Sequence, residues 1–341
     1  MNELKLIIKL AFITGLKDVV VSEVSRYSNI RVIKKDTDSL YLDFVEDLAV
    51  VKHLRSVIRA YVVVQSSQYN PLYISNHKSV LASLVEVVIG GNEDTFKSFK
   101  ITCAGSDSPE VRSIAHDIKE RYGISEEEEA DMKIYIVKLG EIWEVGVQIT
   151  PRPLSSRAYR VRNMSGAMDP TIAYGVNSLC GLEDADSYLN IFSGSATLLI
   201  EAGQCYPNLK QLTGFDNNKD RISLAIQNIK KAGLIRKIQL KEADIFSKPD
   251  LGRFDVITAD LPFGMAISKN EDLEKLYQCF IEYSQDALHD GGTLALYTSE
   301  HEMLKRIILG SRFKIVKTLE LKFMTSVNAY LRPNIFVCRL K

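Results

Sequence analysis

Short apolar runs alternate with amphipathic stretches in the second half of the chain, from about residue 165 to its end. Apolar runs of strand length lie at 188–192, 212–215, 238–240, 254–259, 293–297, 313–319 and 334–340. Stretches with helical periodicity lie between several of them, at 196–202, 219–232 and 272–288. This alternation predicts an α/β domain whose parallel sheet is covered by helices on both faces. Ligands of such sheets bind at the carboxyl ends of the strands.

The first half of the chain mixes strands and helices without regular alternation. Strand patterns lie at 6–13, 31–33, 40–44, 57–64, 99–103, 133–137 and 142–149. Helical patterns lie at 16–27, 78–88 and 109–122. This half therefore predicts an α+β region. Two domains are also what the length of 341 residues indicates, because one ordinary domain takes roughly 100 to 200.

Composition is that of a folded protein, with 46% hydrophobic and 25% charged residues. No window approaches the roughly 18 to 20 uninterrupted apolar residues of a membrane span, so we expect no membrane contact and a cytoplasmic location. The 5 cysteines form no CxxC pair, and no histidine lies at metal-ligand spacing from them. This pattern predicts reduced thiols and no bound metal.

Charge is balanced, with 43 basic and 43 acidic side chains, which argues against a protein that coats nucleic acid through bulk charge. One short basic stretch lies between the two halves and contains Arg152, Arg157, Arg160 and Arg162. Phosphate binding is the functional interpretation of this cluster. Ion pairs to acids on either domain are the alternative.

Three loops that follow predicted strands of the second half carry candidate ligand contacts. The first, 190–197, is a small-residue turn into a helix, where backbone N–H groups can approach a carboxylate. Asp216 follows the next strand and can accept hydrogen bonds from both hydroxyls of a ribose, or cap a helix. Asp244 suits an exocyclic amine of a purine, with Ile245 or Phe246 against the ring. A plain turn is the alternative for the first and third loops.

The fourth loop is the most specific. It places a carboxylate, a rigid proline and an aromatic ring directly after an apolar strand, in the order Asp260, Leu261, Pro262 and Phe263. The carboxylate and a main-chain carbonyl can accept hydrogen bonds from an amino group, while the ring stacks on a planar base. We therefore expect this loop to hold an amine with its nitrogen aimed at an electrophile.

The order of the four loops resembles class I S-adenosylmethionine-dependent methyltransferases that modify amino groups, whose fourth motif is of the DPPY type. The first loop and the following Leu199–Ala202 resemble a branch of RNA guanine-N2 methyltransferases with an N-terminal THUMP domain, whose motif runs D-P-F-C-G-S-G-T and then L-I-E-A. Arg157–Arg160 resembles the R-G-Y-R of that branch. Asn190 stands where the branch usually has Asp, Ser193 where it often has Cys, and Ala196 where it usually has Gly.

The resemblance implies S-adenosylmethionine as cofactor and a class I (Rossmann-like) methyltransferase domain with a mixed sheet. Residues 1–155 would form a ferredoxin-like and THUMP RNA-binding region, 156–168 a basic linker, and 169–341 the methyltransferase domain. Implied cofactor contacts are Asn190, Phe192, Ser193, Gly194, Ser195, Thr197, Asp216, Asn217, Asp244 and Ile245.

The resemblance also implies an activity, which is methyl transfer to the N2 of a guanosine in tRNA by a monomer. Asp260, Leu261 and Pro262 would bind the amine and Phe263 would stack on the base. One alternative is ribosomal RNA, or another amino group, as the target. A second alternative is a non-catalytic RNA-binding relative whose cofactor site is weakened by Asn190 and Ala196.

Overall fold

The computed structural model describes residues 5–69, 73–91, 95–162, 164, 166–262, 270–326 and 329–341. Contacts divide the chain into two compact units. The first comprises Met1–Phe12 and Val20–Ser155, and the second comprises Ile13–Val19 and Ser156–Lys341. The assignment of 13–19 to the second unit was not expected from the sequence.

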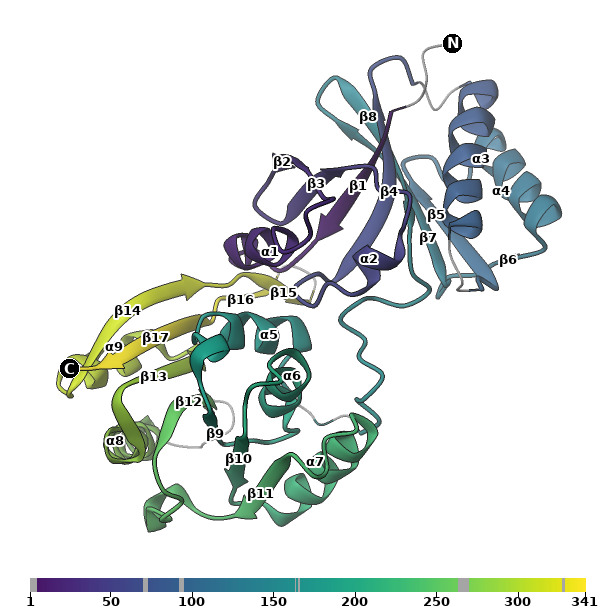
Figure 1. The fold of residues 1–341 in the computed structure, drawn as a ribbon. Helices are drawn as coiled ribbons and strands as arrows, with labels where there is room; N and C mark the ends of the chain where they lie inside the picture. Colours follow the sequence, from purple (N-terminus) through teal and green to yellow (C-terminus); the bar gives the residue numbers. More distant parts are fainter. Residues whose placement is uncertain are drawn as a thin grey trace. The chain divides into compact units, whose positions relative to one another are not determined.

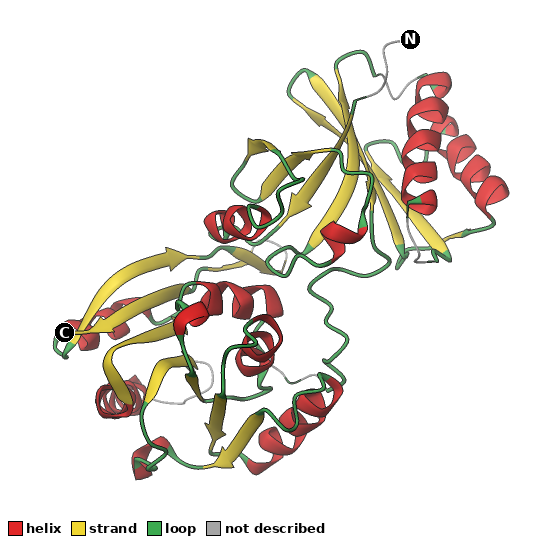
Figure 2. Cartoon of the chain, viewed as in Figure 1, coloured by secondary structure: helices red, strands yellow, loops and turns green. Residues whose placement is uncertain are grey.

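The first unit contains an eight-stranded mixed sheet with the order β2-β3-β1-β4-β8-β7-β5-β6. Its strands are β1 (Leu6–Ala11), β2 (Val32–Lys35), β3 (Ser39–Asp43), β4 (Arg59–Ser66), β5 (Ser98–Cys103), β6 (Ser125–Glu126), β7 (Met132–Leu139) and β8 (Ile142–Gln148). Its helices are α1 (Lys17–Val24), whose first residues belong to the second unit, α2 (Ala49–Lys52), α3 (Ile74–Gly90) and α4 (Pro109–Tyr122). Figure 2 shows α3 and α4 beside the strands.

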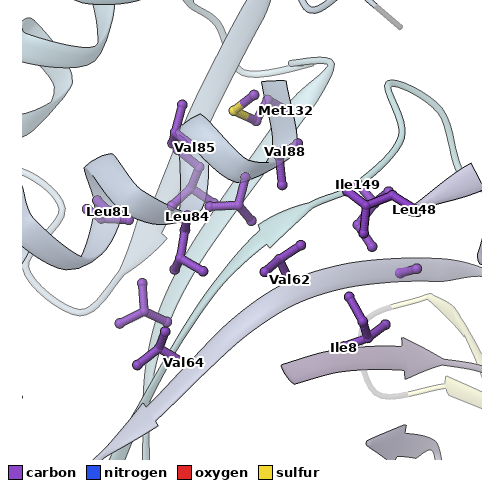
Figure 3. Close-up of a cluster of buried hydrophobic side chains, with 14 of the residues drawn as sticks. Ile8, Leu48, Val62, Val64, Leu81, Leu84, Val85, Val88, Met132 and Ile149 are labelled. Atoms are coloured by element: carbon purple, nitrogen blue, oxygen red, sulfur yellow. The ribbon is translucent and has the colours of Figure 1, made fainter. Parts of the chain in front are cut away.

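One face of this sheet forms the core of the first unit, because strand side chains alternate between the two faces. Val62 and Val64 on β4 point to the same face as Ile8 on β1, and all three are buried. Leu84 and Val88 of α3 pack in the same cluster (Figure 3). The α+β character expected for this half follows from this arrangement.

The second unit contains a seven-stranded sheet with the order β11-β10-β9-β12-β13-β17-β14. Its strands are β9 (Ser187–Ile191), β10 (Gln211–Asp216), β11 (Ile238–Glu242), β12 (Phe254–Asp260), β13 (Leu288–Thr298), β14 (Phe313–Glu320) and β17 (Asn334–Leu340). The five adjacent strands from β11 to β13 run parallel to one another, whereas β17 runs antiparallel to β13 and β14. The mixed sheet expected for a class I methyltransferase domain is confirmed.

Helices cover both faces of this sheet (Figure 1). Helices α5 (Pro170–Ser178), α6 (Thr197–Cys205) and α7 (Lys219–Lys231) lie on one face, and α8 (Asn270–Ala287) and α9 (His301–Leu309) on the other. Short elements complete the unit: the 3-10 turns η1 (Leu182–Asp184) and η2 (Ile245–Ser247), and a hairpin of β15 (Phe323–Ser326) and β16 (Ala329–Leu331). None of the described helices is long and apolar enough to cross a membrane.

The strand order places the site. After β9 the chain adds β10 and β11 on one side, and then β12 and β13 on the other. The direction of winding therefore reverses between β9 and β12, which is where open α/β sheets bind ligands, outside the carboxyl ends of the strands. Because β9, β10, β11 and β12 are parallel, the four loops singled out in the sequence leave the sheet at this same edge.

Candidate active site

A cavity of about 420 Å³ opens at this edge, and all four loops line it. Every described residue that the sequence nominated for the cofactor or for the amine lies on its wall. These residues are Asn190, Phe192, Ser193, Gly194, Ser195, Thr197, Asp216, Asn217, Asp244, Ile245, Asp260, Leu261 and Pro262. Phe263 lies outside the described residues. The structure thus brings the nominated residues together, and their roles toward a ligand stay predictions.

The first loop, between β9 and α6, has a left-handed backbone. Phe192, Gly194 and Ala196 have φ values of 57°, 48° and 61°. Such values suit glycine and are strained for other residues, and strain of this kind gathers where backbone is held against a ligand. Ala196 is fully buried and lies immediately before α6, at the position where related sequences usually have Gly. One alternative from the sequence was a cofactor site weakened by Ala196, and the structure adds the conformational cost of an alanine with this left-handed backbone.

Asp216, at the end of β10, ties the first two loops together. One carboxylate oxygen accepts the Gly194 N–H at 2.9 Å, and the other accepts the Asn218 N–H at 3.0 Å. The side chain is 2% exposed. Asp216 is not the cap of the following helix, because Asn218 caps α7 by accepting the Arg221 N–H at 3.0 Å. A carboxylate held in this way faces the cavity at a fixed position.

Asp244 caps the turn η2 by accepting the Phe246 N–H at 3.0 Å, which is the turn interpretation left open by the sequence. The residue nevertheless lines the cavity and is exposed. Ile245 beside it is 2% exposed, whereas Phe246 is 58% exposed. Ile245 is therefore part of the hydrophobic core, and its edge forms an apolar wall of the cavity next to the Asp244 carboxylate.

Ser193 supplies an independent sign that the cavity is built for a polar ligand. Its hydroxyl is buried and has no hydrogen-bond partner among the described residues. Buried polar groups are almost always hydrogen-bonded, since leaving one unpaired costs about 1–3 kcal/mol. Ser193 lines the cavity together with the Asp216 and Asp244 carboxylates. This combination of acceptors, apolar wall and unpaired hydroxyl fits the ribose, purine and polar tail of S-adenosylmethionine.

Asn190 belongs to a group of buried polar side chains from β9, β12 and α5 that are joined by hydrogen bonds. Its amide Nδ2 donates to the backbone oxygen of Thr258 at 3.2 Å. The Thr258 hydroxyl donates to the Tyr188 hydroxyl at 2.7 Å, and Tyr188 donates to the side-chain oxygen of Asn177 at 2.7 Å. An aspartate at 190 would have no hydrogen to donate to the Thr258 carbonyl. The departure from the usual Asp is therefore matched by the surroundings in this chain.

The carboxylate of the fourth loop differs from those of Asp216 and Asp244, because no described residue donates to it. Asp260 ends β12, and no hydrogen bond between described residues ends on its side chain. Burial raises the pKa of Asp260 to about 7. The backbone beyond it is fixed at two points: the Leu261 N–H donates to the Tyr297 carbonyl at 2.9 Å, and the Tyr277 hydroxyl donates to the Pro262 carbonyl at 2.8 Å.

The basic cluster is divided by the structure. Arg157 donates through Nε to Glu201 at 3.0 Å, and the two side chains are 9% and 0% exposed. Tyr159 donates to the same carboxylate oxygen at 2.8 Å. This is the ion-pair alternative, and it corrects the expectation of phosphate binding for Arg157, because a guanidinium buried in this way is not available to a backbone phosphate. It anchors the linker to α6.

The other three arginines remain candidates for phosphate. Arg152 and Arg162 are exposed, and Arg160 is half-buried. Arg162 donates to the side chain of Gln227 at 2.8 Å on the exposed surface, and its backbone N–H donates to Asn228 at 3.0 Å. The linker is thus held by α6 and α7 of the second unit.

Sequence reasoning missed several residues of the site. Met164, Met168 and Arg221 line the cavity. The two methionines lie in the segment expected to be only a basic linker, and a methionine in a linker carries no signal of a ligand contact. Arg221 stands in the first turn of α7, directly after the Asp216 loop, so its place in the sequence could have nominated it. Tyr277 comes from α8 and has no sequence motif.

Comparison with known proteins places the chain in a family. Residues 157–327 match the family described as the RMKL-like methyltransferase domain. This match covers half of the chain, and it falls on the second unit, whose fold and site have the class I methyltransferase pattern. The chain belongs to the RMKL-like methyltransferase domain family.

Two relatives with assigned activities show local similarity. The tRNA (guanine(6)-N2)-methyltransferase of Thermus thermophilus is 29% identical over 208 residues, which cover 59% of this chain and 60% of that protein. The U6 snRNA (guanine-N(2))-methyltransferase of Bos taurus is 26% identical over 234 residues, which cover 65% of this chain and 45% of that protein. The chain therefore spans about half the length of these relatives.

Solved structures show the same fold along nearly the whole chain. TrmN from Thermus thermophilus aligns with a TM-score of 0.78 and 23% identity, over 98% of this chain and 100% of that chain. SMU.472, solved as a complex with SAH, aligns with a TM-score of 0.72 and 15% identity, over 98% of each chain. Both units of this protein therefore have folds like those in these solved structures.

Proposed function

We propose that this protein transfers a methyl group from S-adenosylmethionine to the exocyclic N2 of a guanosine in tRNA. The observation that carries the proposal is the Asp260 carboxylate, to which no described residue donates a hydrogen bond and which lies beside the Leu261 and Pro262 carbonyls on one wall of a cavity lined by cofactor-type loops. The names of the relatives support guanine N2 as the acceptor. They also support RNA as the substrate, with tRNA favoured over ribosomal RNA.

The cofactor-binding wall has a separable task for each loop. Asp216 would accept hydrogen bonds from the ribose hydroxyls through lone pairs that Gly194 and Asn218 do not use. Asp244 would accept a hydrogen bond from the adenine amine, with Ile245 against the ring. The first loop and the Ser193 hydroxyl would bind the polar tail. When bound, S-adenosylmethionine supplies an electrophilic methyl group, so the protein needs no nucleophile of its own.

The amine-binding wall must make a poor nucleophile react. The lone pair of guanine N2 is delocalised into the ring, and hydrogen bonds to Asp260 and to a carbonyl of the loop would localise it. As the N–CH3 bond forms and the S–CH3 bond breaks, positive charge develops on N2. Asp260 stabilises this charge when ionised, and its pKa of about 7 allows it to accept the proton that N2 releases. Phe263 would stack on the base.

RNA contacts outside the cavity are needed as well. A paired guanosine must leave its helix to reach the cavity, which costs a few kcal/mol. Arg152, Arg160 and Arg162 would bind phosphates and offset this cost. The first unit, which we interpret as ferredoxin-like and THUMP parts, would add RNA contacts. A cytoplasmic monomer that acts on tRNA satisfies these requirements.

Incubation with radiolabelled S-adenosylmethionine and unmodified RNA tests this function. We expect label in tRNA transcripts, none in the same transcripts with inosine in place of guanosine, and none with the Asp260→Ala variant. Inosine lacks only the 2-amino group, so the pair isolates the acceptor atom. Label in ribosomal RNA alone would favour that alternative. Failure to bind S-adenosylhomocysteine would favour the second candidate function, which is RNA binding without catalysis by a protein with a weakened cofactor site.

A further inference from the structure

The hydroxyl of Tyr277, on α8, donates a hydrogen bond to the Asp260 loop. Its oxygen lies 2.8 Å from the Pro262 carbonyl oxygen and 2.8 Å from the Thr298 hydroxyl. Both side chains are fully buried. The ring packs in the hydrophobic core of the second unit, so its position is set by the fold and not by the loop.

The direction of the hydrogen bonds in this group is fixed. The Thr298 hydroxyl accepts the backbone N–H of Glu300 at 3.0 Å, so its own hydrogen is available for Tyr277. Pro262 offers only a carbonyl, which accepts. The chain therefore runs from the Glu300 N–H through Thr298 and Tyr277 to the Pro262 carbonyl. Burial, and then the nearby carboxylates of Glu300 and Asp260, raises the pKa of Tyr277, which keeps its proton in place.

This chain distinguishes the two carbonyls of the loop. The Pro262 carbonyl has a buried donor, whereas no hydrogen bond between described residues ends on the Leu261 carbonyl. The Leu261 carbonyl lies between two groups that are held by hydrogen bonds. The Leu261 N–H donates to the Tyr297 carbonyl, and the Pro262 carbonyl accepts from the Tyr277 hydroxyl. The Leu261 carbonyl follows Asp260 directly and belongs to a residue that lines the cavity. An amine next to Asp260 thus meets one carbonyl to which no described residue donates.

We propose that Tyr277 is a positioning residue, which holds the Pro262 carbonyl and thereby leaves the Asp260 carboxylate and the Leu261 carbonyl as the pair that binds the acceptor amine. The role of this pair rests on the proposed function, whereas the hydrogen bond itself does not. Tyr277 does not line the cavity. It acts by orienting the loop, so its loss affects the reacting geometry more than ligand binding.

Tyr277→Phe removes the hydroxyl and keeps the ring in the core. We expect kcat on the RNA substrate to fall roughly 10-fold, the effect of losing one buried hydrogen bond. The Kd for S-adenosylhomocysteine should not change. Thr298→Val should cause a smaller decrease in kcat, and Thr298→Ser, which keeps the hydroxyl, should restore the wild-type kcat.

Tyr283→Phe is the matched control. Tyr283 lies on the same helix and donates to another prolyl carbonyl, that of Pro249, at 2.9 Å. It does not line the cavity. The two Phe variants lose the same chemical group from the same helix, so they should lose similar stability. Only the Tyr277 variant should lose turnover, and an equal loss in both would show a merely structural effect and overturn the proposal.

The hydrogen bond can be observed without any enzymatic activity. The chain contains a single Pro-Phe pair, Pro262-Phe263. Protein labelled with 13C-carbonyl proline and 15N-phenylalanine therefore gives one HNCO signal for this peptide bond. We expect the Pro262 carbonyl signal to move upfield in Tyr277→Phe and to stay in place in Tyr283→Phe.

Each outcome decides a separate part of the proposal. A carbonyl signal that does not move shows that the hydrogen bond is absent and overturns the proposal. A signal that moves while kcat stays at the wild-type value overturns the positioning role. A signal that moves in a protein that methylates no RNA leaves the bond in place and overturns the proposed function, and the role of Tyr277 in methyl transfer with it.

Discussion

The two walls of the cavity handle their carboxylates in opposite ways. On the cofactor wall, backbone N–H groups hold both oxygens of Asp216 and one oxygen of Asp244. On the amine wall, no described residue donates a hydrogen bond to Asp260, and burial raises the pKa of Asp260 to about 7. A carboxylate that is already hydrogen-bonded is suited to hold a ligand in a fixed position, whereas an unsatisfied one is suited to bind a group whose charge changes during reaction. Under the proposed function, this difference would separate cofactor binding from methyl transfer within one pocket.

The largest expected effect comes from removing the Asp260 carboxylate. Asp260→Ala should lower kcat by about 100-fold or more, because it removes the group that faces the developing charge. The Kd for S-adenosylhomocysteine, measured by calorimetry, should stay unchanged. Full activity in this variant would show that Asp260 has no role in methyl transfer, and the contrast between the two walls would then have no functional meaning.

The converse change on the cofactor wall should act on binding. Asp216→Ala removes acceptors of the ribose and of the Gly194 N–H, so the Kd for S-adenosylhomocysteine should rise about 10- to 100-fold. At saturating cofactor, kcat should recover to within a few-fold of wild type, since the amine wall is intact. Loss of kcat without loss of affinity would show that the two walls are not separable.

The pKa of Asp260 predicts a stability that depends on pH. The folded state raises this pKa above the ordinary value of about 4, so wild type loses stability as the pH rises from about 4 to 7. Asp260→Asn lacks this penalty. Because Asp260 is half-buried, we expect the variant to be more stable by about 1–3 kcal/mol at pH 8, and equal to wild type below pH 4. Urea denaturation at several pH values measures this, and parallel curves would contradict it.

The smallest expected effect concerns the strained turn. Ala196→Gly relieves a left-handed φ of 61° and should raise the free energy of unfolding by about 0.5–1 kcal/mol. It should also leave the affinity for S-adenosylhomocysteine equal or higher, because the backbone can approach the ligand more closely. Chemical denaturation and calorimetry check both parts, and a destabilised variant would show that the methyl group is needed for packing.

Local signals predicted much of the fold. The helix expected at 109–122 has those same bounds, because Ser108 accepts the Val111 N–H at its start and Gly123 ends it with a left-handed φ. By contrast, α5 was missed, although Asp169 caps it and Pro170 begins it. The strand β13 begins at Leu288 and not near 293, since its pairing with β12 extends through an irregularity at Phe254. Tertiary pairing decided that boundary, and the sequence does not display it.

The site was predicted in part for a similar reason. The four loops could be nominated because each follows an apolar strand, and parallel strands bring such loops to one edge. The contacts between the loops could not be predicted from the sequence. The hydrogen bond from the Gly194 N–H to Asp216, for example, joins two loops that only the folded sheet brings together. The buried pairing of Arg157 with Glu201 was open for the same reason, since an arginine motif does not tell whether its partner is an acid or a phosphate.

The identity of the methylated nucleoside tests the central claim most directly. After incubation of the protein with S-adenosylmethionine and unmodified tRNA, the RNA would be digested to nucleosides and analysed by mass spectrometry against standards. The account predicts N2-methylguanosine, absent when Asp260→Ala replaces wild type. A methyl group on a ring nitrogen, on a ribose or on adenosine would contradict it, because the account assigns the Asp260 loop to the exocyclic amine of guanosine.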